Sequence, residues 1–210
     1  MPTNLPEPAY RIHTQRLVLR CWQPTDATLL SNAIVESLDH LRVWMPWAHH
    51  EEPKDLQQRM GWLRKARGKF DLNQSFLYGI FNSDETQVLG GIGLHPRVGD
   101  DALEIGYWIH ADHINQGLAT EAAAALTNVA FAVHQVERVE IHCNPDNFRS
   151  AAVPRKLGFI HEATLRKRVE GHEGKKRDAM IWTLFAEDFV TSRAAEATIE
   201  AFDAMGRMLL

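Results

Sequence analysis

Residues 103–122 read Leu-Glu-Ile-Gly-Tyr-Trp-Ile-His-Ala-Asp-His-Ile-Asn-Gln-Gly-Leu-Ala-Thr-Glu-Ala and carry the strongest structural signal in the chain. The segment from Leu103 to Ile109 is short, apolar and aromatic, which predicts a strand. From about Gly117 to Val133, apolar residues recur at steps of three or four, which predicts an amphipathic helix. The chain therefore passes from a strand through a short loop into a helix that has glycine at its entrance.

The entrance of this helix has the composition of an anion-binding site. A helix start presents unpaired backbone N–H groups and the positive end of the helix dipole. Gly117 lets a ligand approach the backbone, and Thr120 adds a hydroxyl. Asn115 and Gln116 add amide donors. Together these groups could hold a pyrophosphate, although many helices begin with glycine and bind no anion. The segment lacks both Gly-x-Gly-x-x-Gly and Gly-Lys-Ser/Thr, which disfavours a nucleotide-dependent dehydrogenase or an NTPase.

The remaining chain alternates strand and helix patterns, without an internal repeat or a linker. We expect further strands at 16–20, 75–81, 88–94, 136–143, 159–166 and 177–184. We expect helices at 29–38, 55–68, 150–157 and 188–210. Residues 96–101 predict the turn of an antiparallel hairpin, and residues 1–11 read as a loosely ordered lead-in. The mixture predicts one α/β domain over residues 1–210 with a mixed (α+β) sheet, a core over about 12–189 and an appended C-terminal helix over about 188–210.

Composition places the chain among ordinary globular proteins. Its 210 residues are 45% hydrophobic and 24% charged, with a formal net charge of −4. This balance lacks the basic surface that general nucleic-acid binding needs. The chain has no run long and apolar enough for a membrane span, and its polar N-terminus does not read as a secretory signal.

The cysteines and histidines argue against a disulfide framework and against a metal site. Only Cys21 and Cys143 occur, far apart, so we expect two reduced thiols in a cytoplasmic protein. The cluster His49-His50-Glu51-Glu52 contains residue types that bind metals, but neighbouring residues on a helix point in different directions. We therefore expect no metal ion.

Five segments occur in an order that resembles a known superfamily. They are Thr14-Gln-Arg-Leu-Val-Leu-Arg20, Glu104-Ile-Gly-Tyr-Trp-Ile109, Gln116-Gly-Leu-Ala-Thr-Glu-Ala122, Asn147-Phe-Arg-Ser150 and Lys156-Leu-Gly-Phe159. Over about residues 12–189 the chain resembles the GNAT superfamily, and within it the RimJ/RimL-like branch of ribosomal-protein N-terminal acetyltransferases. The resemblance implies the GNAT acyl-CoA N-acyltransferase fold, a splayed mixed sheet flanked by helices. It also implies acetyl-CoA as cosubstrate, held between two central strands with its pyrophosphate on the helix after the fourth strand.

The resemblance assigns catalytic roles to Glu104 and Ser150. An attacking amine is mostly protonated at neutral pH, and a carboxylate on a central strand could take its proton, directly or through water. Ser150 could donate a proton or a hydrogen bond to the leaving thiolate. The plain alternatives are a solvent-facing strand glutamate and a serine that caps a helix. The cofactor-binding residues that the resemblance implies are Trp108, Ile109, Asn115, Gln116, Gly117, Leu118, Ala119, Thr120, Asn147 and Ser150.

Some positions depart from the family pattern or carry a plain alternative. Ile114 stands where Arg or Gln commonly lies, three residues before the first glycine, which leaves the pyrophosphate mainly to backbone N–H groups. Asn147 is expected to hold the cofactor arm with its amide, or else to cap a helix. Pro154 lies inside the predicted helix 150–157, so we expect this helix to start late or to be distorted. The segment Trp44–Trp47 resembles the substrate-side wall of the branch.

These residues predict an enzyme that transfers acetyl from acetyl-CoA to an amine. The chain has no Gly-x-Ser-x-Gly and no recognisable Cys–His motif, so we expect direct attack in a ternary complex rather than an acetyl-enzyme. The N-terminal α-amine of a ribosomal protein is the first candidate acceptor. The alternatives are a small amine, an aminoacyl compound or an antibiotic as acceptor, and a non-catalytic acyl-CoA-binding module. Beyond acetyl-CoA and the amine we expect no nucleic-acid and no membrane partner, and a homodimer is left open.

Overall fold

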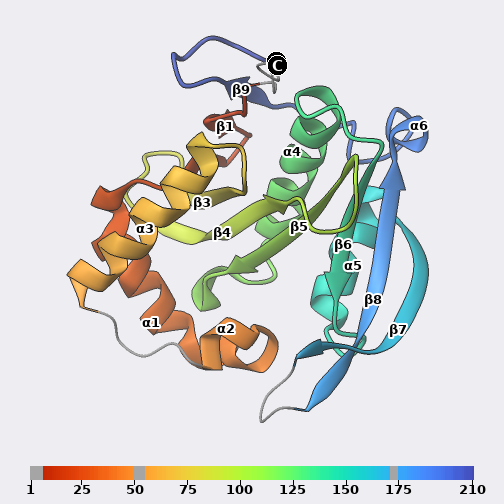
Figure 1. Ribbon diagram of the computed structural model, residues 1–210, viewed down its shortest axis with the longest axis horizontal. Helices are drawn as coiled ribbons and strands as arrows, with labels where there is room; N and C mark the ends of the chain where they lie inside the picture. Colours follow the sequence, from red (N-terminus) through yellow and green to blue (C-terminus); the bar gives the residue numbers. More distant parts are fainter. Residues whose placement is uncertain (1–6, 50–54, 171–174) are drawn as a thin grey trace.

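The computed structural model describes residues 7–49, 55–170 and 175–210 (Figure 1). Its strands are β1 (Arg11–His13), β2 (Leu17–Cys21), β3 (Phe76–Asn82), β4 (Val88–His95), β5 (Ala102–Ile109), β6 (Arg138–Cys143), β7 (Ile160–Glu170), β8 (Lys176–Phe185) and β9 (Glu200–Phe202). Its helices are α1 (Ala27–Trp44), α2 (Pro46–His49), α3 (Leu56–Asp71), α4 (Leu118–Ala132), α5 (Phe148–Leu157) and α6 (Ala186–Phe189), with short 3-10 turns η1 (Pro24–Asp26) and η2 (Ala111–His113). Every element predicted between residues 16 and 184 forms, although α1 is longer than its sequence pattern.

The strands form one mixed sheet in the order β7-β8-β6-β5-β4-β3-β2-β1-β9. Every neighbouring pair is antiparallel except β5 and β6, which run parallel. The predicted hairpin joins β4 to β5 and brings His95 opposite Glu104. β5 pairs with β6 only from Ala102 opposite Arg138 to Glu104 opposite Glu140, and no pairing continues beyond. This parting of two central strands is the splay that the family resemblance implies.

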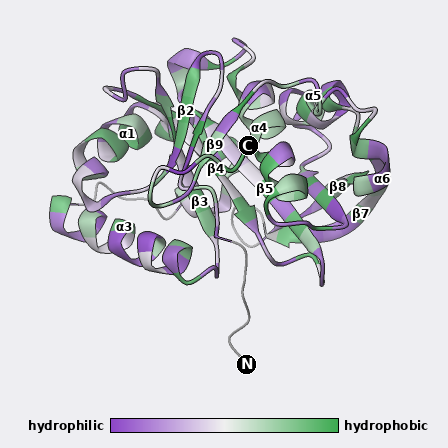
Figure 2. Ribbon diagram, turned by 90° about the horizontal axis from the view of Figure 1, so that it is seen from above, coloured by the Kyte–Doolittle hydropathy of each residue, from purple (hydrophilic) through white to green (hydrophobic). Residues whose placement is uncertain are grey.

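Helices cover both faces of the sheet, with α1 and α3 on one face and α4 and α5 on the other (Figure 2). The alternation of side chains along β2 reflects these two layers. Leu17 and Leu19 pack in the core cluster that contains Leu126 of α4. Val18 points the other way and packs in the cluster that contains Leu30 of α1. A strand covered on both faces is apolar on both sides, which is why Leu17, Val18 and Leu19 are consecutive apolar residues.

The expectations drawn from composition concern the cysteines, the histidine cluster and the possibility of a membrane-spanning helix. Cys21 and Cys143 are free, buried thiols, as the sequence predicts. Within the described residues, no three His, Cys, Asp or Glu side chains are grouped to hold a metal ion. Residues 50–52 of the His49–Glu52 cluster lie outside them. None of the described helices combines the length and apolar character that crossing a membrane requires.

The predicted C-terminal helix over residues 188–210 is wrong. Only the short α6 is helical there, and after a series of turns β9 pairs antiparallel with β1. Burial along β9 and the residues before it has a period of two. Ile199 and Ala201 are at least partly buried, whereas Thr198 and Glu200 are exposed. The physical reason is edge pairing: β1 would otherwise end the sheet with a row of unpaired backbone groups, and β9 covers that edge.

β1 is a second element that the sequence pattern did not show, because residues 1–11 read as an irregular lead-in. Its three residues are too few to display alternation, and their pairing with β2 and β9 holds them in place. Ile12 at its centre is fully buried, and the N–H of Tyr10 donates to the carbonyl of Phe202 at 2.7 Å. The first and last described strands therefore pair with each other at the same edge of the sheet.

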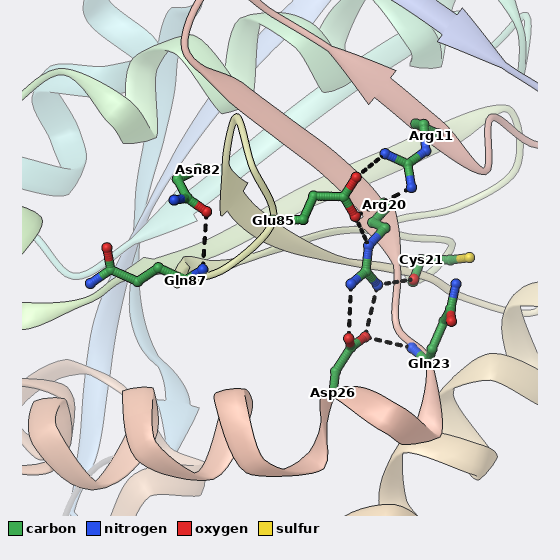
Figure 3. A network of polar contacts seen from close by, with 8 residues as sticks. All are labelled: Arg11, Arg20, Cys21, Gln23, Asp26, Asn82, Glu85 and Gln87. Carbon is green, nitrogen blue, oxygen red and sulfur yellow. Dashed lines mark hydrogen bonds and ion pairs between the residues drawn. The ribbon is translucent and has the colours of Figure 1, made fainter.

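A buried ion-pair network fastens the end of β2 to the start of α1 (Figure 3). The guanidinium of Arg20 donates to both carboxylate oxygens of Asp26 at 2.8 Å and also to Glu85. It lies 4.0 Å from the ring centroid of Phe81. Asp26, only 4% exposed, also accepts the backbone N–H of Gln23 at 2.8 Å. Such a network stabilises the fold only while each charge keeps its partners.

Asp26→Asn should destabilise the protein strongly, because the Arg20 guanidinium stays buried without its charged partner. Breaking a buried ion pair costs about 3–5 kcal/mol, and the remaining bond to Glu85 should keep the loss near the lower value. Urea denaturation measures the free energy of unfolding. The matched control is Asp39→Asn, which removes the same charge from an exposed ion pair with Arg42 and should cost less than about 0.5 kcal/mol. Equal losses in the two variants would contradict a stabilising role for the buried pair.

Candidate active site

A cleft of 1090 Å³ opens where β5 and β6 part. Its walls come from β4, β5 and β6, from the segment joining α1 to α2, from α3, and from the hairpin of β7 and β8. The segment Trp44–Trp47, expected to form a substrate-side wall, lines it. The structure brings both predicted catalytic residues into this one cavity. The predicted site residues that line the cleft are Glu104, Trp108, Asn147 and Ser150.

Ser150 lies in the first turn of α5 and is bonded to β5 across the gap. The hydroxyl of Tyr107 donates to the Ser150 carbonyl at 3.1 Å and lies 3.0 Å from Ser150 Oγ. In a regular helix this carbonyl would accept the N–H four residues on, but Pro154 has no N–H. Tyr107 therefore supplies the hydrogen bond that the proline removes. Burial raises the pKa of Tyr107 far above its usual value, so the phenol keeps its proton.

The start of α5 overturns the expectation that Pro154 makes this helix start late, which was one of two expected effects. The helix begins at Phe148, two residues before the predicted start, so the proline lies in its interior and does not delay it. Asn147 is the N-cap: its side-chain oxygen accepts the N–H of Ser150 at 3.1 Å. The helix ends at Gly158, whose φ of 90° is the left-handed conformation in which glycine commonly ends a helix. Asn147 thus caps the helix, which is one of the two roles expected for it. The cap uses only the side-chain oxygen, so the NH2 group of the amide remains available as a donor.

Trp108 on β5 packs against a glycine of β4. A Cβ added at Gly91 would lie 2.5 Å from Trp108 Nε1, so a side chain there would displace the indole. The same indole meets Trp47 edge to face, with ring centroids 6.4 Å apart. This contact links β5 to α2 and closes one side of the cleft.

Glu104 is 7% exposed and is held by Arg97 in a two-pronged ion pair. Arg97 Nε and Nη2 lie 2.7 and 2.5 Å from its two carboxylate oxygens. His142 Nδ1 is 3.7 Å from Glu104, while His142 Nε2 is 2.6 Å from Glu140. Burial would raise the pKa of Glu104, but Arg97, with His142 and His95, outweighs burial and lowers it. Glu104 is therefore a buried, ionised carboxylate and not a solvent-facing strand residue.

The other residues expected to bind the cofactor lie at the end of β5, in the loop that follows and in the first turn of α4, outside the lining of the cleft. Asn115 and Gly117 have positive φ values of 61° and 81°, which turn the chain sharply into α4. Gly117 is the N-cap and has no side chain to bond the helix start, so the first N–H groups of α4 lack intrahelical acceptors. Leu118 is buried, which leaves its backbone as its contribution to a ligand site. The residues concerned are Ile109, Asn115, Gln116, Gly117, Leu118, Ala119 and Thr120.

Arg16 is a residue of this entrance that sequence reasoning missed. Its guanidinium donates to the Gln116 carbonyl at 3.0 Å, and a Cβ on Gly117 would lie 3.5 Å from its Nη2. It also pairs with Glu121 at 2.6 Å. The Glu121 carboxylate accepts hydrogen bonds from the Thr14 hydroxyl at 2.6 Å and from the Arg16 N–H at 3.0 Å. Two of the five sequence segments quoted above thus meet in one contact between the β1–β2 turn and the start of α4.

Residues 16–160 match the family described as the acetyltransferase (GNAT) domain. The chain belongs to the GNAT acetyltransferase family. It is 26% identical over 190 residues to the [ribosomal protein uS5]-alanine N-acetyltransferase of Escherichia coli K12, which covers 89% of this chain and 96% of that protein. Its fold is similar to that of Mycobacterium smegmatis RimJ in complex with CoA-disulfide, with a TM-score of 0.73, 23% identity, and 90% and 92% of the two chains covered.

A third relative widens the range of ligands seen on this fold. The microcin C7 self-immunity acetyltransferase MccE, in complex with acetyl-CoA and AMP, has a TM-score of 0.72 and 20% identity, over 81% of this chain and 93% of that one. The GNAT fold predicted from the five sequence segments is confirmed by these likenesses and by the splayed mixed sheet.

Tyr107→Phe should destabilise this GNAT domain by about 1–2 kcal/mol, because the Ser150 carbonyl loses its donor. In the Tyr107→Phe background, Pro154→Ala should recover part of that loss, since the restored N–H can bond to the same carbonyl. In the parent background the carbonyl is already bonded, so no such recovery is available. Urea denaturation of the four proteins in a double-mutant cycle measures the coupling. Strictly additive effects would contradict the compensating role of Tyr107.

Proposed function

We propose that this GNAT acetyltransferase transfers acetyl from acetyl-CoA to the α-amine at a protein N-terminus, by direct attack of the amine on the thioester. One observation carries the proposal. The parting of β5 and β6 puts a buried carboxylate, Glu104, and a hydroxyl, Ser150, on the walls of a single cleft. A module that only bound acyl-CoA would need neither group there, so the pair favours the catalytic alternative.

The entrance of α4 fits the pyrophosphate of acetyl-CoA. The first three N–H groups of the helix lack intrahelical acceptors, and the helix dipole adds positive potential at the same place. Gly117 has no side chain to keep phosphate oxygens away from this backbone. Arg16 also lies at the entrance, where its guanidinium bonds to the Gln116 carbonyl and pairs with Glu121, so it fixes the shape of the entrance and adds no net charge there. When bound, acetyl-CoA supplies an acetyl group already activated as a thioester.

In the proposed reaction Glu104 attracts the acceptor amine and removes its proton. Because Arg97 lowers the pKa of Glu104, the carboxylate stays ionised at neutral pH and attracts an ammonium group. The same lowered pKa makes it a weak base. Removal of the amine proton by Glu104, directly or through water, and its passage onward to solvent are therefore both part of the proposal.

Ser150 gives a hydrogen bond to the sulfur as the C–S bond breaks. Its Oγ lies 3.0 Å from the Tyr107 hydroxyl, whose one proton goes to the Ser150 carbonyl, so Ser150 can donate to Tyr107 at rest and turn its proton to the sulfur as the thiolate forms. Cys143 also borders the cleft, but burial raises the pKa of its thiol. A protonated thiol is a poor nucleophile, which supports direct transfer rather than an acetyl-cysteine.

The identity of the acceptor rests on relatives. The E. coli relative is named for acetylating an alanine of ribosomal protein uS5, which supports a ribosomal N-terminus as the first candidate. A small amine or an aminoacyl nucleotide is the second candidate, because MccE was solved with AMP and because this cleft has five indoles. Aromatic rings of this kind can stack on a nucleobase. The indoles are those of Trp22, Trp44, Trp47, Trp62 and Trp108.

Release of free CoA thiol in the presence of a panel of amines tests the proposal. Peptides beginning with Ala, Ser and Met should be acetylated. Glu104→Gln should lower kcat by about 10²–10⁴-fold with acetyl-CoA affinity unchanged, because the amide keeps the shape but accepts no proton. Ser150→Ala should lower kcat more than it raises KM, because the serine acts only as the bond breaks.

The matched control is Glu187→Gln on the exposed face of α6, which should leave kcat unchanged. Absence of thiol release with every amine would refute the transferase. Acetylation of small amines or aminoacyl nucleotides alone would replace the protein N-terminus by the second candidate.

The acid limb of the pH profile of kcat/KM should report the ionisation of Glu104. Burial raises the pKa of Glu104 and the Arg97 pair lowers it further than burial raises it. Activity should therefore persist to pH values below the usual glutamate pKa of about 4.3. In Arg97→Gln burial dominates, the pKa rises, and the limb should move to higher pH. Coincident limbs in the two proteins would show that Arg97 does not set the charge of Glu104.

The free energy of unfolding should depend on pH with the same sign as the activity. Since the folded-state pKa of Glu104 lies below the unfolded value, its contribution to stability is present above the unfolded pKa. That contribution is lost as the pH falls through the folded-state pKa, and it should be smaller in Arg97→Gln.

A further inference from the structure

The hairpin of β7 and β8 carries a concentrated positive charge beside the cleft. Residues 166–178 contain six Lys or Arg and three Asp or Glu, whereas the whole chain has a net charge of −4. The basic residues are Arg166, Lys167, Arg168, Lys175, Lys176 and Arg177. A local excess of one sign in a chain of the opposite sign needs an explanation other than solubility.

A bulge in β7 displays the first three of these residues. Leu165 pairs with Ala179 and Val169 pairs with Arg177, so three residues of β7 face the single Asp178 of β8. Lys167 in the middle of the bulge has a φ of 54°, and its N–H donates to Asp178 Oδ1 at 2.9 Å. The bulge is thus a bonded feature that holds consecutive basic side chains off the regular ladder.

The hairpin is fixed to the opposite wall of the cleft. Arg177 Nη1 donates to the carbonyl of Val43 near the end of α1 at 2.8 Å. Arg168 and Arg177 line the cleft, together with Trp44 and Trp47 on the facing wall. The basic hairpin and the aromatic segment therefore border the same mouth.

The two arginines of the bulge keep their positive charges available for a ligand. Arg166 and Arg168 are exposed, and within the described residues neither forms an ion pair with a carboxylate. Arg168 borders the cleft, and Arg166 lies two residues before it in the same bulge of β7. Positive charge thus extends from the cleft along the hairpin. This distribution matches an extended anionic chain better than it matches a compact ion.

We propose that the β7–β8 hairpin selects acceptors that carry acidic side chains in the residues following the reactive amine. This rests on the proposed function, since it names the class of acceptor for the same site. The amine end of the peptide reaches Glu104 inside the cleft, and the acidic residues behind it lie along Arg168 and Arg166 at the mouth. Charges at the rim of a binding site act mainly through specificity and association rate, and salt screens them.

The experiment compares three peptides that begin with the same residue, the one most active in the amine panel, and continue with acidic, neutral or basic residues. The parent should show a higher kcat/KM for the acidic peptide than for the basic one, and added salt should narrow the gap. In Arg166→Gln/Arg168→Gln the ratio of kcat/KM for the acidic over the neutral peptide should fall about 3- to 10-fold, chiefly through KM, as expected for two exposed charge contacts.

The control variant Arg64→Gln/Lys65→Gln removes two positive charges from exposed positions of α3 outside the cleft lining and should keep the parent ratio. A parent that acetylates acidic and basic peptides equally would overturn the inference while leaving the proposed function intact. A third result would be a higher KM for acetyl-CoA in the hairpin variant with an unchanged ratio between the acidic and neutral peptides. It would show that the hairpin arginines bind the cofactor and not the acceptor, and it would also overturn the inference. If no peptide is acetylated, the proposed function itself fails.

Discussion

The pairing of β5 with β6 ends at Glu104 and Glu140, and the geometry of the site depends on that ending. Two strands that stayed paired would satisfy each other's backbone groups and leave no room for a ligand between them. Here a side chain spans the gap instead: Tyr107 on β5 bonds to Ser150 on α5, at the carbonyl that Pro154 leaves free. Pro154, which was expected from the sequence to delay or distort α5, therefore helps to join α5 to β5, because it leaves the Ser150 carbonyl free for Tyr107.

The sequence predicted the elements around this gap because each carries its signal locally. The apolar run of β5, the glycine before α4 and the glycine after α5 are read without knowledge of the fold. The partners of the site residues were not predicted. Arg97 reaches Glu104 only through the register of the β4–β5 hairpin, and His142 approaches only because β6 lies beside β5. Arg16 meets Glu121 across the sheet, and no local pattern encodes such a contact.

The wrong helix at the C-terminus has a related cause. Alanines and large apolar residues spaced along 188–210 satisfied a helical period, while burial follows a period of two near Ala201. What decides between the periods is the free edge of β1, an element of three residues that the sequence did not reveal. Two weak signals far apart in the chain stabilise each other, so neither could be recognised without the other.

The charges of the cleft are ordered along the path of the acceptor. An ammonium group that enters past Arg168 and Arg177 meets repulsion unless a negative charge lies further in. Burial works against an ionised Glu104, and the two-pronged bond from Arg97 reverses that effect. The result is an anion inside a mouth rimmed by cations. A peptide whose end is cationic and whose following residues are anionic has the complementary order, so the lowered pKa of Glu104 and the basic hairpin serve the same selection. If Glu104 were neutral, the ammonium group of the acceptor would meet only the repulsion from the cationic side chains at the mouth.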